Sequence, residues 1–179
     1  MSHFKIYIAT SLDGFIAKND GSVDWLEEIE NPNQLDHGYT DFYSGIDAVV
    51  MGRNTYEEVR GFDVEWPYPD CRTFVLTRKD TIDFYSPKTE LIHSVDIDSI
   101  SKLRKASEKG IWIIGGGKVI TAFLNQDVVD ELIITIFPVI LGNGIPLFGD
   151  HPKETRLKLI NAESFDTGLV NLHYKVMAS

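Results

Sequence analysis

Apolar residues in this chain fall into short runs separated by helix-like stretches. A continuous apolar run indicates a strand covered on both faces of its sheet, whereas alternation with polar residues indicates a strand with one solvated face. The pattern predicts six or seven strands, at residues 4–10, 48–51, 73–77, 111–114, 131–141, 157–165 and 170–177. The last run differs from the early ones because Val170, Leu172 and Tyr174 alternate with polar residues.

Helical stretches lie between these runs. We expect helices at residues 33–43, 54–60, 97–109 and 118–125. The third would begin at a cap, Asp96 or Asp98, and stop at Gly110. Strands that alternate with helices, followed by a strand-rich final third, predict an α/β fold with a mostly parallel sheet and an antiparallel C-terminal hairpin. Pro138 inside the 131–141 run indicates a bulge or a sheet edge.

Length and charge narrow the classes of protein. We expect one domain over residues 1–179. The net charge of −10 repels nucleic acid and anionic membranes, so we expect neither as a partner. The N-terminus shows no signal-peptide layout and Cys71 has no second cysteine to pair with, which is compatible with a cytoplasmic protein.

Three consecutive glycines stand between the predicted strand at 111–114 and the helix after it. Gly115, Gly116 and Gly117 allow positive φ and let a ligand touch the main chain. The helix starting near Lys118 and Val119 would direct its free N–H groups into this turn, which suits a phosphate or pyrophosphate. The spacing matches neither the Rossmann fingerprint nor the Walker loop, and a purely structural bend explains it equally well.

Two further strand ends carry similar residues. They hold Gly52, Arg53 and Thr55 after the second strand, and Thr77, Arg78 and Lys79 after the third. Each set alone has an ordinary explanation as a helix cap or as solvated charges. Because ligands of open α/β sheets bind at the carboxyl ends of the strands, the three sets together predict a site for a nucleotide with an additional phosphate.

The segments VVMGRNTYEEV, FVLTRK and IWIIGGGKVITAFL resemble the dihydrofolate reductase superfamily. The SLDGFIA of residues 11–17 and the FPVILGNGIPLFG of residues 137–149 are most similar to the branch that contains the riboflavin-biosynthesis reductase and its stand-alone relatives. The resemblance implies a three-layer fold with helices on both faces of the sheet, and NADPH as cofactor.

The resemblance also implies roles for individual residues. The glycines at 115–117 would contact the pyrophosphate, with Gly52, Arg53 and Thr55 at a second phosphate-contacting helix start. Thr77, Arg78 and Lys79 would face the adenosine ribose and its 2′-phosphate. Ala9 and Ile16 would lie against the nicotinamide, with the loop around Ile16 closing over the ring.

A carboxylate is the expected partner of the substrate ring. In dihydrofolate reductases an acid precedes the Met-Gly-Arg strand, and Asp36 lies sixteen residues before Gly52. Asp41 points in another direction on the same predicted helix, so we favour Asp36; the alternative is that both are solvated acids. Asp13 contacts the substrate in this interpretation, or else only forms the turn beside Gly14.

We therefore expect an NADPH-dependent reductase of a small planar heterocycle. The closest named activity is 5-amino-6-(5-phosphoribosylamino)uracil reductase, the second is dihydrofolate reductase, and the alternative of another class is an NADPH-binding module or sensor without turnover. A homodimer is an open expectation, because relatives often pair. Cys71 and the scattered histidines show no metal-ligand spacing, so no metal site is predicted.

One region departs from the riboflavin reductases. They carry an Asp-x-Pro-x-Leu-Thr-x-Arg stretch that grips the ribose phosphate of the substrate, and residues 61–72 here lack it. This difference speaks against a phosphoribosyl substrate. Trp66 and Tyr68 in the same region would either stack on a planar ring or pack on their own domain.

Overall fold

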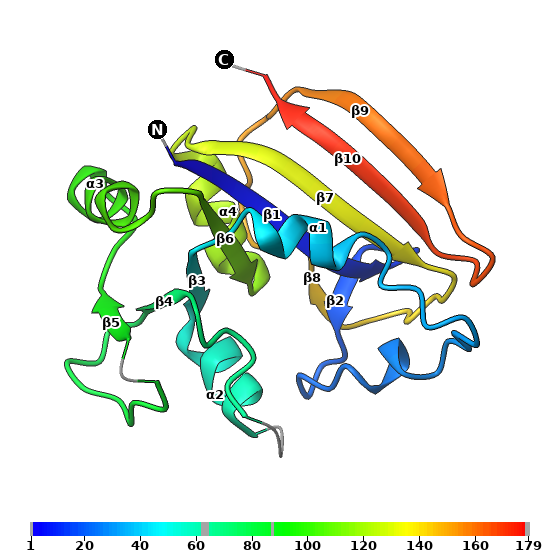
Figure 1. The fold of residues 1–179 in the computed structure, drawn as a ribbon, viewed down its shortest axis with the longest axis horizontal. Coiled ribbons are helices and arrows are strands. Elements are labelled where there is room, and N and C mark those ends of the chain that lie inside the picture. The colour runs from blue at the N-terminus through cyan, green and yellow to red at the C-terminus, as the bar shows by residue number, and fades with distance from the viewer. Residues whose placement is uncertain (1, 62–64, 87, 178–179) are drawn as a thin grey trace.

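A single eight-stranded sheet organises the computed structural model, which describes residues 2–61, 65–86 and 88–177. The strand order is β5-β4-β3-β6-β1-β7-β10-β9 (Figure 1). The strands are β1 (His3–Ser11), β3 (Ala48–Gly52), β4 (Arg72–Leu76), β5 (Thr89–Ile92), β6 (Gly110–Gly115), β7 (Val129–Phe137), β9 (Leu157–Ser164) and β10 (Val170–Val176). The pairs from β5 to β7 are parallel, and β10 is antiparallel to both β7 and β9. The predicted α/β sheet with an antiparallel C-terminal hairpin is confirmed.

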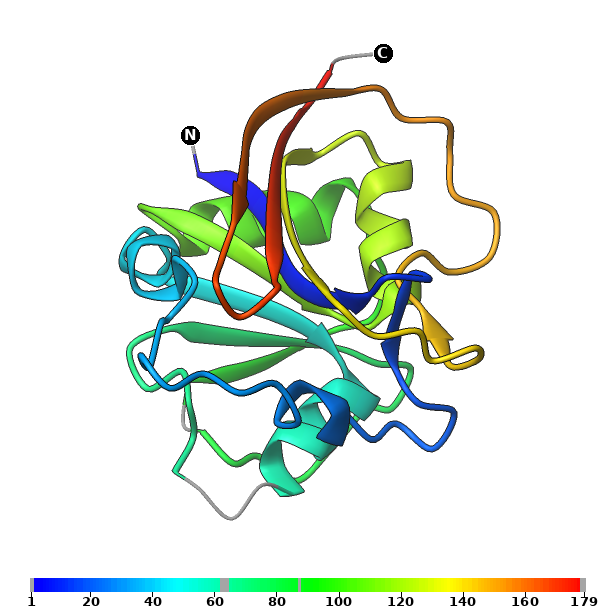
Figure 2. The ribbon, with the colours of Figure 1, turned by 90° about the vertical axis from the view of Figure 1, so that its right-hand side faces the viewer.

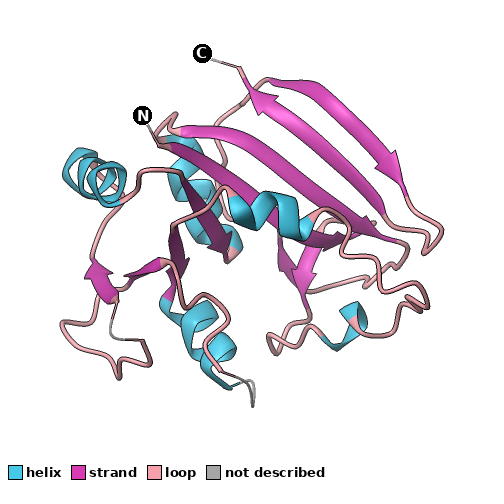
Figure 3. Ribbon diagram, viewed as in Figure 1, coloured by secondary structure: helices cyan, strands magenta, loops and turns pink. Residues whose placement is uncertain are grey.

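Helices cover both faces of the sheet (Figure 3). They are α1 (Tyr39–Ser44), α2 (Arg53–Gly61), α3 (Ile97–Ala106) and α4 (Gly117–Asn125). Successive residues of β3 point to opposite faces, so Ala48 and Val50 pack with α3 and α4, while Val49 and Met51 pack with α1 and α2. The continuous apolar run of β3 therefore serves two cores, one on each face.

A small second sheet was not predicted. It consists of β2 (Phe15–Ala17) and β8 (Ile145–Pro146), which pair antiparallel. The two strands come from opposite ends of the chain, and Figure 2 shows them side by side, β2 in blue and β8 in gold. The loop after β2 contains a short 3-10 helix, η1 (Asp24–Leu26). The long loop after β1 is thus held by the segment that follows β7.

The helix predicted at 33–43 is wrong over its first half. The helix α1 begins only at Tyr39, and Gln34, His37 and Gly38 have positive φ. The Asp36 carboxylate accepts hydrogen bonds from the N–H groups of Gly38 and Thr40. Such side-chain bonds to nearby backbone compete with helix formation, which explains the turns that precede α1.

Two other predicted boundaries are wrong for equally local reasons. The strand expected to reach Leu141 ends at Phe137, because Pro138 has no N–H to continue the ladder. The helix expected to reach Lys109 ends at Ala106. Beyond it, the Asp47 carboxylate accepts hydrogen bonds from the Ser107 hydroxyl and from the next two backbone N–H groups, which draws this segment out of the helix.

Over the described part of the chain, no helix combines the length and the apolar character needed to cross a membrane.

Candidate functional site

A cleft of about 2000 Å³ lies at the carboxyl ends of β3, β4 and β6. Every residue predicted to bind the cofactor lines it. These residues are Ala9, Ile16, Gly52, Arg53, Thr55, Thr77, Arg78, Lys79, Gly115, Gly116, Gly117, Lys118 and Val119. The structure therefore brings the three predicted strand ends together at one site.

The glycine turn forms one wall of the cleft. Gly115 has φ of 140° and its peptide bond to Gly116 is cis. The helix α4 follows at once, with no side chain capping its first turn. Because the first N–H groups of a helix have no partner within it, this end offers backbone donors and a positive dipole end to an anion.

The glycines of this turn have different structural roles. A Cβ atom placed on Gly117 would lie 2.2 Å from the carbonyl oxygen of Pro146, so β8 crosses directly over that position. A Cβ atom on Gly116 would find only the Thr55 hydroxyl at 3.8 Å and the Ile16 side chain at 4.0 Å. Gly117 is therefore required by packing, whereas Gly116 leaves backbone open to the cleft.

The start of α2 faces the start of α4. Thr55 lies across from Gly116, and a Cβ atom on Gly52 would be 3.1 Å from Cγ2 of Val119. Arg53 lines the cleft with its guanidinium 2.9 Å from the Glu57 carboxylate. Two helix N-termini thus converge on the same space, and each can offer backbone N–H groups to a phosphate.

The end of β4 supplies the third part of this wall. The Thr77 hydroxyl accepts a hydrogen bond from the N–H of Lys79, and the carbonyl oxygen of Thr77 lies 2.9 Å from Nδ1 of His93. Arg78 and Lys79 extend from this fixed turn and are exposed to solvent at the edge of the cleft. Because both side chains are exposed, they can bind an anionic ligand without breaking buried contacts.

On the α1 side of the sheet the cleft continues into an aromatic recess, which the sequence did not reveal. Tyr7, Tyr39 and Trp112 line it, with ring centroids 6.0 to 6.3 Å apart. The Trp112 indole N–H donates to the Tyr7 carbonyl oxygen at 3.0 Å, which fixes the ring. Burial raises the pKa of Tyr7 and of Tyr39, so both hydroxyls keep their protons at neutral pH.

One signal for this recess was present in the sequence. Tyr7 precedes Ala9 by two positions on β1, and residues two apart on a strand share a face. If Ala9 lies at the nicotinamide, as the resemblance implies, then Tyr7 faces the same side of the strand. Tyr39 and Trp112 come from α1 and β6, and only the fold brings them to Tyr7.

Asp36 lies outside the residues that line the cleft. It is exposed, and its carboxylate is occupied by the N–H groups of Gly38 and Thr40. Hydrogen bonds from the Thr40 side chain and from these N–H groups lower the pKa of Asp36. These contacts describe a carboxylate that organises the start of α1, and the acid role stays a prediction. Asp41 is likewise exposed on α1.

Asp13 also lies outside the cleft lining, where it links two loops. Its carboxylate accepts hydrogen bonds from the Ser11 hydroxyl at 2.6 Å and from the N–H groups of Leu141 and Gly142 at 3.1 and 2.7 Å. The Ser11 hydrogen bond is the main reason that the pKa of Asp13 is lowered, and the two N–H groups add to it. Asp13 thus ties the loop after β1 to the loop after β7.

Trp66 and Tyr68 belong to the core on the α1 and α2 face. Trp66 packs edge-on against Tyr68 at 5.4 Å, and Tyr68 packs against Trp112 in the same way. Neither lines the cleft. Of the two interpretations, packing within the domain is therefore the one the structure supports.

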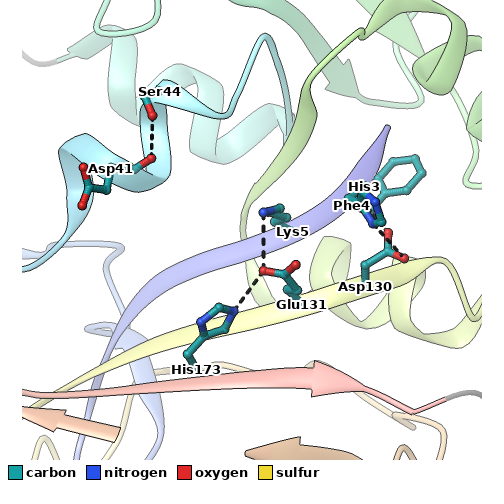
Figure 4. Close-up of polar contacts among 8 residues, drawn as sticks. All are labelled: His3, Phe4, Lys5, Asp41, Ser44, Asp130, Glu131 and His173. Carbon is teal, nitrogen blue, oxygen red and sulfur yellow. Dashed lines mark hydrogen bonds and ion pairs between the residues drawn. The ribbon is translucent and has the colours of Figure 1, made fainter. Parts of the chain in front are cut away.

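A charged cluster lies on the same face of β1, β7 and β10, away from the cleft lining (Figure 4). Glu131 sits between His173 at 2.9 Å and Lys5 at 3.4 Å. Burial acts to raise the pKa of Glu131, but the partners outweigh it and the pKa is lowered. In the described residues, no group of three or more His, Cys, Asp or Glu side chains is arranged to hold a metal ion.

Comparison with known proteins agrees with this architecture. The chain matches the model of the RibD C-terminal domain over residues 69–171. It is 41% identical to the uncharacterized protein YwjB of Bacillus subtilis (strain 168), covering 94% of this chain and 95% of that one.

Solved structures show the same arrangement. A protein from Shewanella sp. PV-4, provisionally described as a riboflavin biosynthesis protein, superposes with a TM-score of 0.89 at 36% identity, covering 98% of this chain and 99% of that one. The diaminohydroxyphosphoribosylaminopyrimidine deaminase/5-amino-6-(5-phosphoribosylamino)uracil reductase of Thermotoga maritima superposes with a TM-score of 0.69 at 19% identity. That match covers 98% of this chain but 57% of the Thermotoga chain, and it shows the fold alone.

The match over more than half of the chain, together with the close relationship to YwjB, identifies the family: this protein belongs to the RibD C-terminal domain family.

Proposed function

We propose that this chain is an NADPH-dependent reductase of a small planar heterocycle. The aminouracil reduction in the name of the Thermotoga relative is the nearest known activity. The observation that carries the proposal is the convergence of three strand ends on one cleft, with two helix N-termini facing each other across it. The bare backbone at Gly116 and the exposed cations Arg78 and Lys79 fit a dinucleotide that bears a third phosphate.

Different residues of the chain would bind the phosphates of the cofactor and the reacting rings. The glycine turn and the start of α2 would hold the pyrophosphate, and the end of β4 would hold the 2′-phosphate. When bound, NADPH supplies the hydride. Ala9 and Ile16 would seat the ring that carries it, and the aromatic recess would orient the substrate and exclude water.

The proton that accompanies hydride transfer needs a donor near the substrate. Among the titratable side chains that line the recess, Tyr7 and Tyr39 hold their protons at neutral pH because burial raises the pKa of each. The Tyr39 hydroxyl can therefore donate a hydrogen bond to a ring nitrogen or oxygen, whereas the Tyr7 hydroxyl donates to the His37 carbonyl oxygen at 3.2 Å and would first have to leave it. A proton delivered through water remains compatible with the same geometry, because the cleft is open to solvent along its acidic edge at Asp20.

Thermal unfolding of the purified protein with NADPH, NADH or flavin mononucleotide tests the proposal. A ligand at about a hundred times its dissociation constant should stabilise the fold by roughly 2.7 kcal/mol. We expect the largest shift with NADPH, and NADPH oxidation when a suitable heterocycle is added. A shift without oxidation of NADPH by any heterocycle would favour the binding module, and the lack of any shift would overturn the proposal.

A further inference from the structure

We propose that the substrate end of this cleft selects a planar ring that carries no phosphate or carboxylate, and that Glu58 is the residue that sets this preference. The inference rests on the proposed function, because it concerns the substrate of the same site. It gives this chain a different substrate class from the phosphoribosyl compound in the name of the Thermotoga protein.

Charge is distributed unevenly along the cleft. Arg78, Lys79 and Lys118 line the end where the helices begin. Asp20 and Glu58 line the side of the cleft that is formed by α2 and by the loop after β2. Oε2 of Glu58 lies 4.0 Å from the Cβ position of Gly21, so the side chain of α2 reaches the loop that follows β2. Val59, the next residue of α2, belongs to the same hydrophobic cluster as Tyr7, Tyr39 and Trp112, so α2 flanks the aromatic recess as well as this loop.

The cations on α2 and on the loop after β2 already have acidic partners. Lys18 is 2.8 Å from Asp24, Arg53 is 2.9 Å from Glu57, and Arg60 is 3.5 Å from Asp83. Each cation would have to leave its carboxylate before it could bind an anion.

The chain after α2 adds no positive charge. Residues 61–71 contain three acids and no lysine or arginine. Arg72, the next cation, lies at the amino end of β4, away from the strand ends that form the cleft, and it is 2.5 Å from Glu90. Within the described residues that line the recess, no lysine or arginine is available to a substrate phosphate.

The walls of the recess favour a flat and uncharged or cationic ligand. Tyr7, Tyr39 and Trp112 present aromatic surface, on which a planar heterocycle can stack. The negative face of an aromatic ring also attracts a cation, whereas it gives an anion no favourable electrostatic interaction. A phosphate carries a charge of about −1.5 to −2 at pH 7. Beside Glu58 that charge would be repelled and would find no compensating donor.

A pair of ligands that differ only in the phosphate tests the inference. Binding of 5-amino-6-(ribosylamino)uracil and of its 5′-phosphate to the protein saturated with NADP+, which cannot reduce them, can be followed by tryptophan fluorescence, since Trp112 lines the recess. We expect the unphosphorylated compound to bind about tenfold more tightly, which corresponds to 1.4 kcal/mol. Equal or tighter binding of the phosphate, or no detectable binding of the unphosphorylated ring, would overturn the inference.

Variants then assign the preference to Glu58. Glu58→Gln should narrow the difference between the two ligands, and Glu58→Lys should reverse it. Glu154→Lys makes the same charge change on an exposed residue outside the cleft lining and should leave the preference as it was. An unaltered preference in Glu58→Lys would reject the role of this residue. The thermal shift with NADPH, measured on every variant, separates a failure of the inference from a failure of the proposed function.

Discussion

Gly117 and Pro146 lie so close that a Cβ atom on Gly117 would be 2.2 Å from the Pro146 carbonyl oxygen. A contact of this kind with backbone cannot be relieved by moving a side chain. Gly117→Ala should therefore lower the free energy of unfolding by about 1–3 kcal/mol or more, as overpacking does. Denaturant unfolding measures the loss. Gly61→Ala is the matched control, since a Cβ atom there has no neighbour within 4 Å.

At the neighbouring Gly116 we expect a substitution to affect cofactor binding rather than stability. Gly116→Ala has room for its methyl group, but that group would stand between the two helix starts where we place the pyrophosphate. We expect the free energy of unfolding to change little, while NADPH binding weakens by about tenfold or more because bare backbone is lost. Titration calorimetry with NADPH would decide this. Unchanged affinity would mean that the phosphate does not rest on this turn.

Arg78 provides a test of cofactor choice. If its guanidinium pairs with the 2′-phosphate, Arg78→Ala should weaken NADPH binding by about tenfold or more, the usual effect of removing a charge-assisted hydrogen bond. NADH lacks that phosphate and serves as the internal control. A parallel loss of affinity for both cofactors would remove Arg78 from this role.

Asp13 and Asp36 make a second matched pair. Asp13→Ala removes the acceptor for the N–H groups of Leu141 and Gly142, so the loop that carries Ile16 should lose part of its attachment to the loop after β7 and shift. We expect kcat/KM to fall by about tenfold, since small misplacements at a site are costly. Asp36→Asn should instead leave kcat nearly unchanged, because its carboxylate contacts the start of α1. A large loss of kcat in Asp36→Asn, with NADPH affinity preserved, would restore the acid role.

Glu131 should make stability depend on acid pH. Its pKa is lowered in the folded protein, because the hydrogen bond from His173 and the charge of Lys5 outweigh the effect of burial. The contribution of ionised Glu131 to the free energy of unfolding is complete above the ordinary glutamate pKa. It is lost as the pH falls through the lower pKa that Glu131 has in the folded protein. The difference in melting temperature between the native chain and Glu131→Gln should therefore shrink below about pH 4.5. Glu163→Gln, an exposed acid on β9, should show no such trend.

The cofactor end of the cleft could be predicted from sequence because it is local. At Gly52 and at Gly115, a buried strand, a glycine and a helix start follow one another within a few residues, and parallel strands bring such segments to one edge. The fold followed from the same alternation of runs. Even so, the short strand β5 was missed, since four residues beginning with Thr89 carry too weak a pattern.

The substrate end could not be predicted in the same way. Tyr7 and Trp112 are more than a hundred positions apart and meet only because β1 pairs with β6. Asp36 shows a different limit of sequence reasoning. Its distance from Gly52 matched the expected acid, but the turns at Gln34 and His37 break the helix that this interpretation required.

The pairing of β2 with β8 limits how the site can open. The loop after β1 is fastened by the Asp13 contacts, by the hydrogen bond from the N–H of Leu147 to the Gly14 carbonyl, and by the pairing at Ala17. A segment held at so many points moves together with its partner or not at all. The next turn, at residues 18–23, is closed by the hydrogen bond from the N–H of Lys18 to the Ser22 carbonyl, and its Asn19 amide donates to Asn143 at 3.0 Å. We expect entry of a ligand to depend on the exposed bond between Asn19 and Asn143, the outermost link between the two segments.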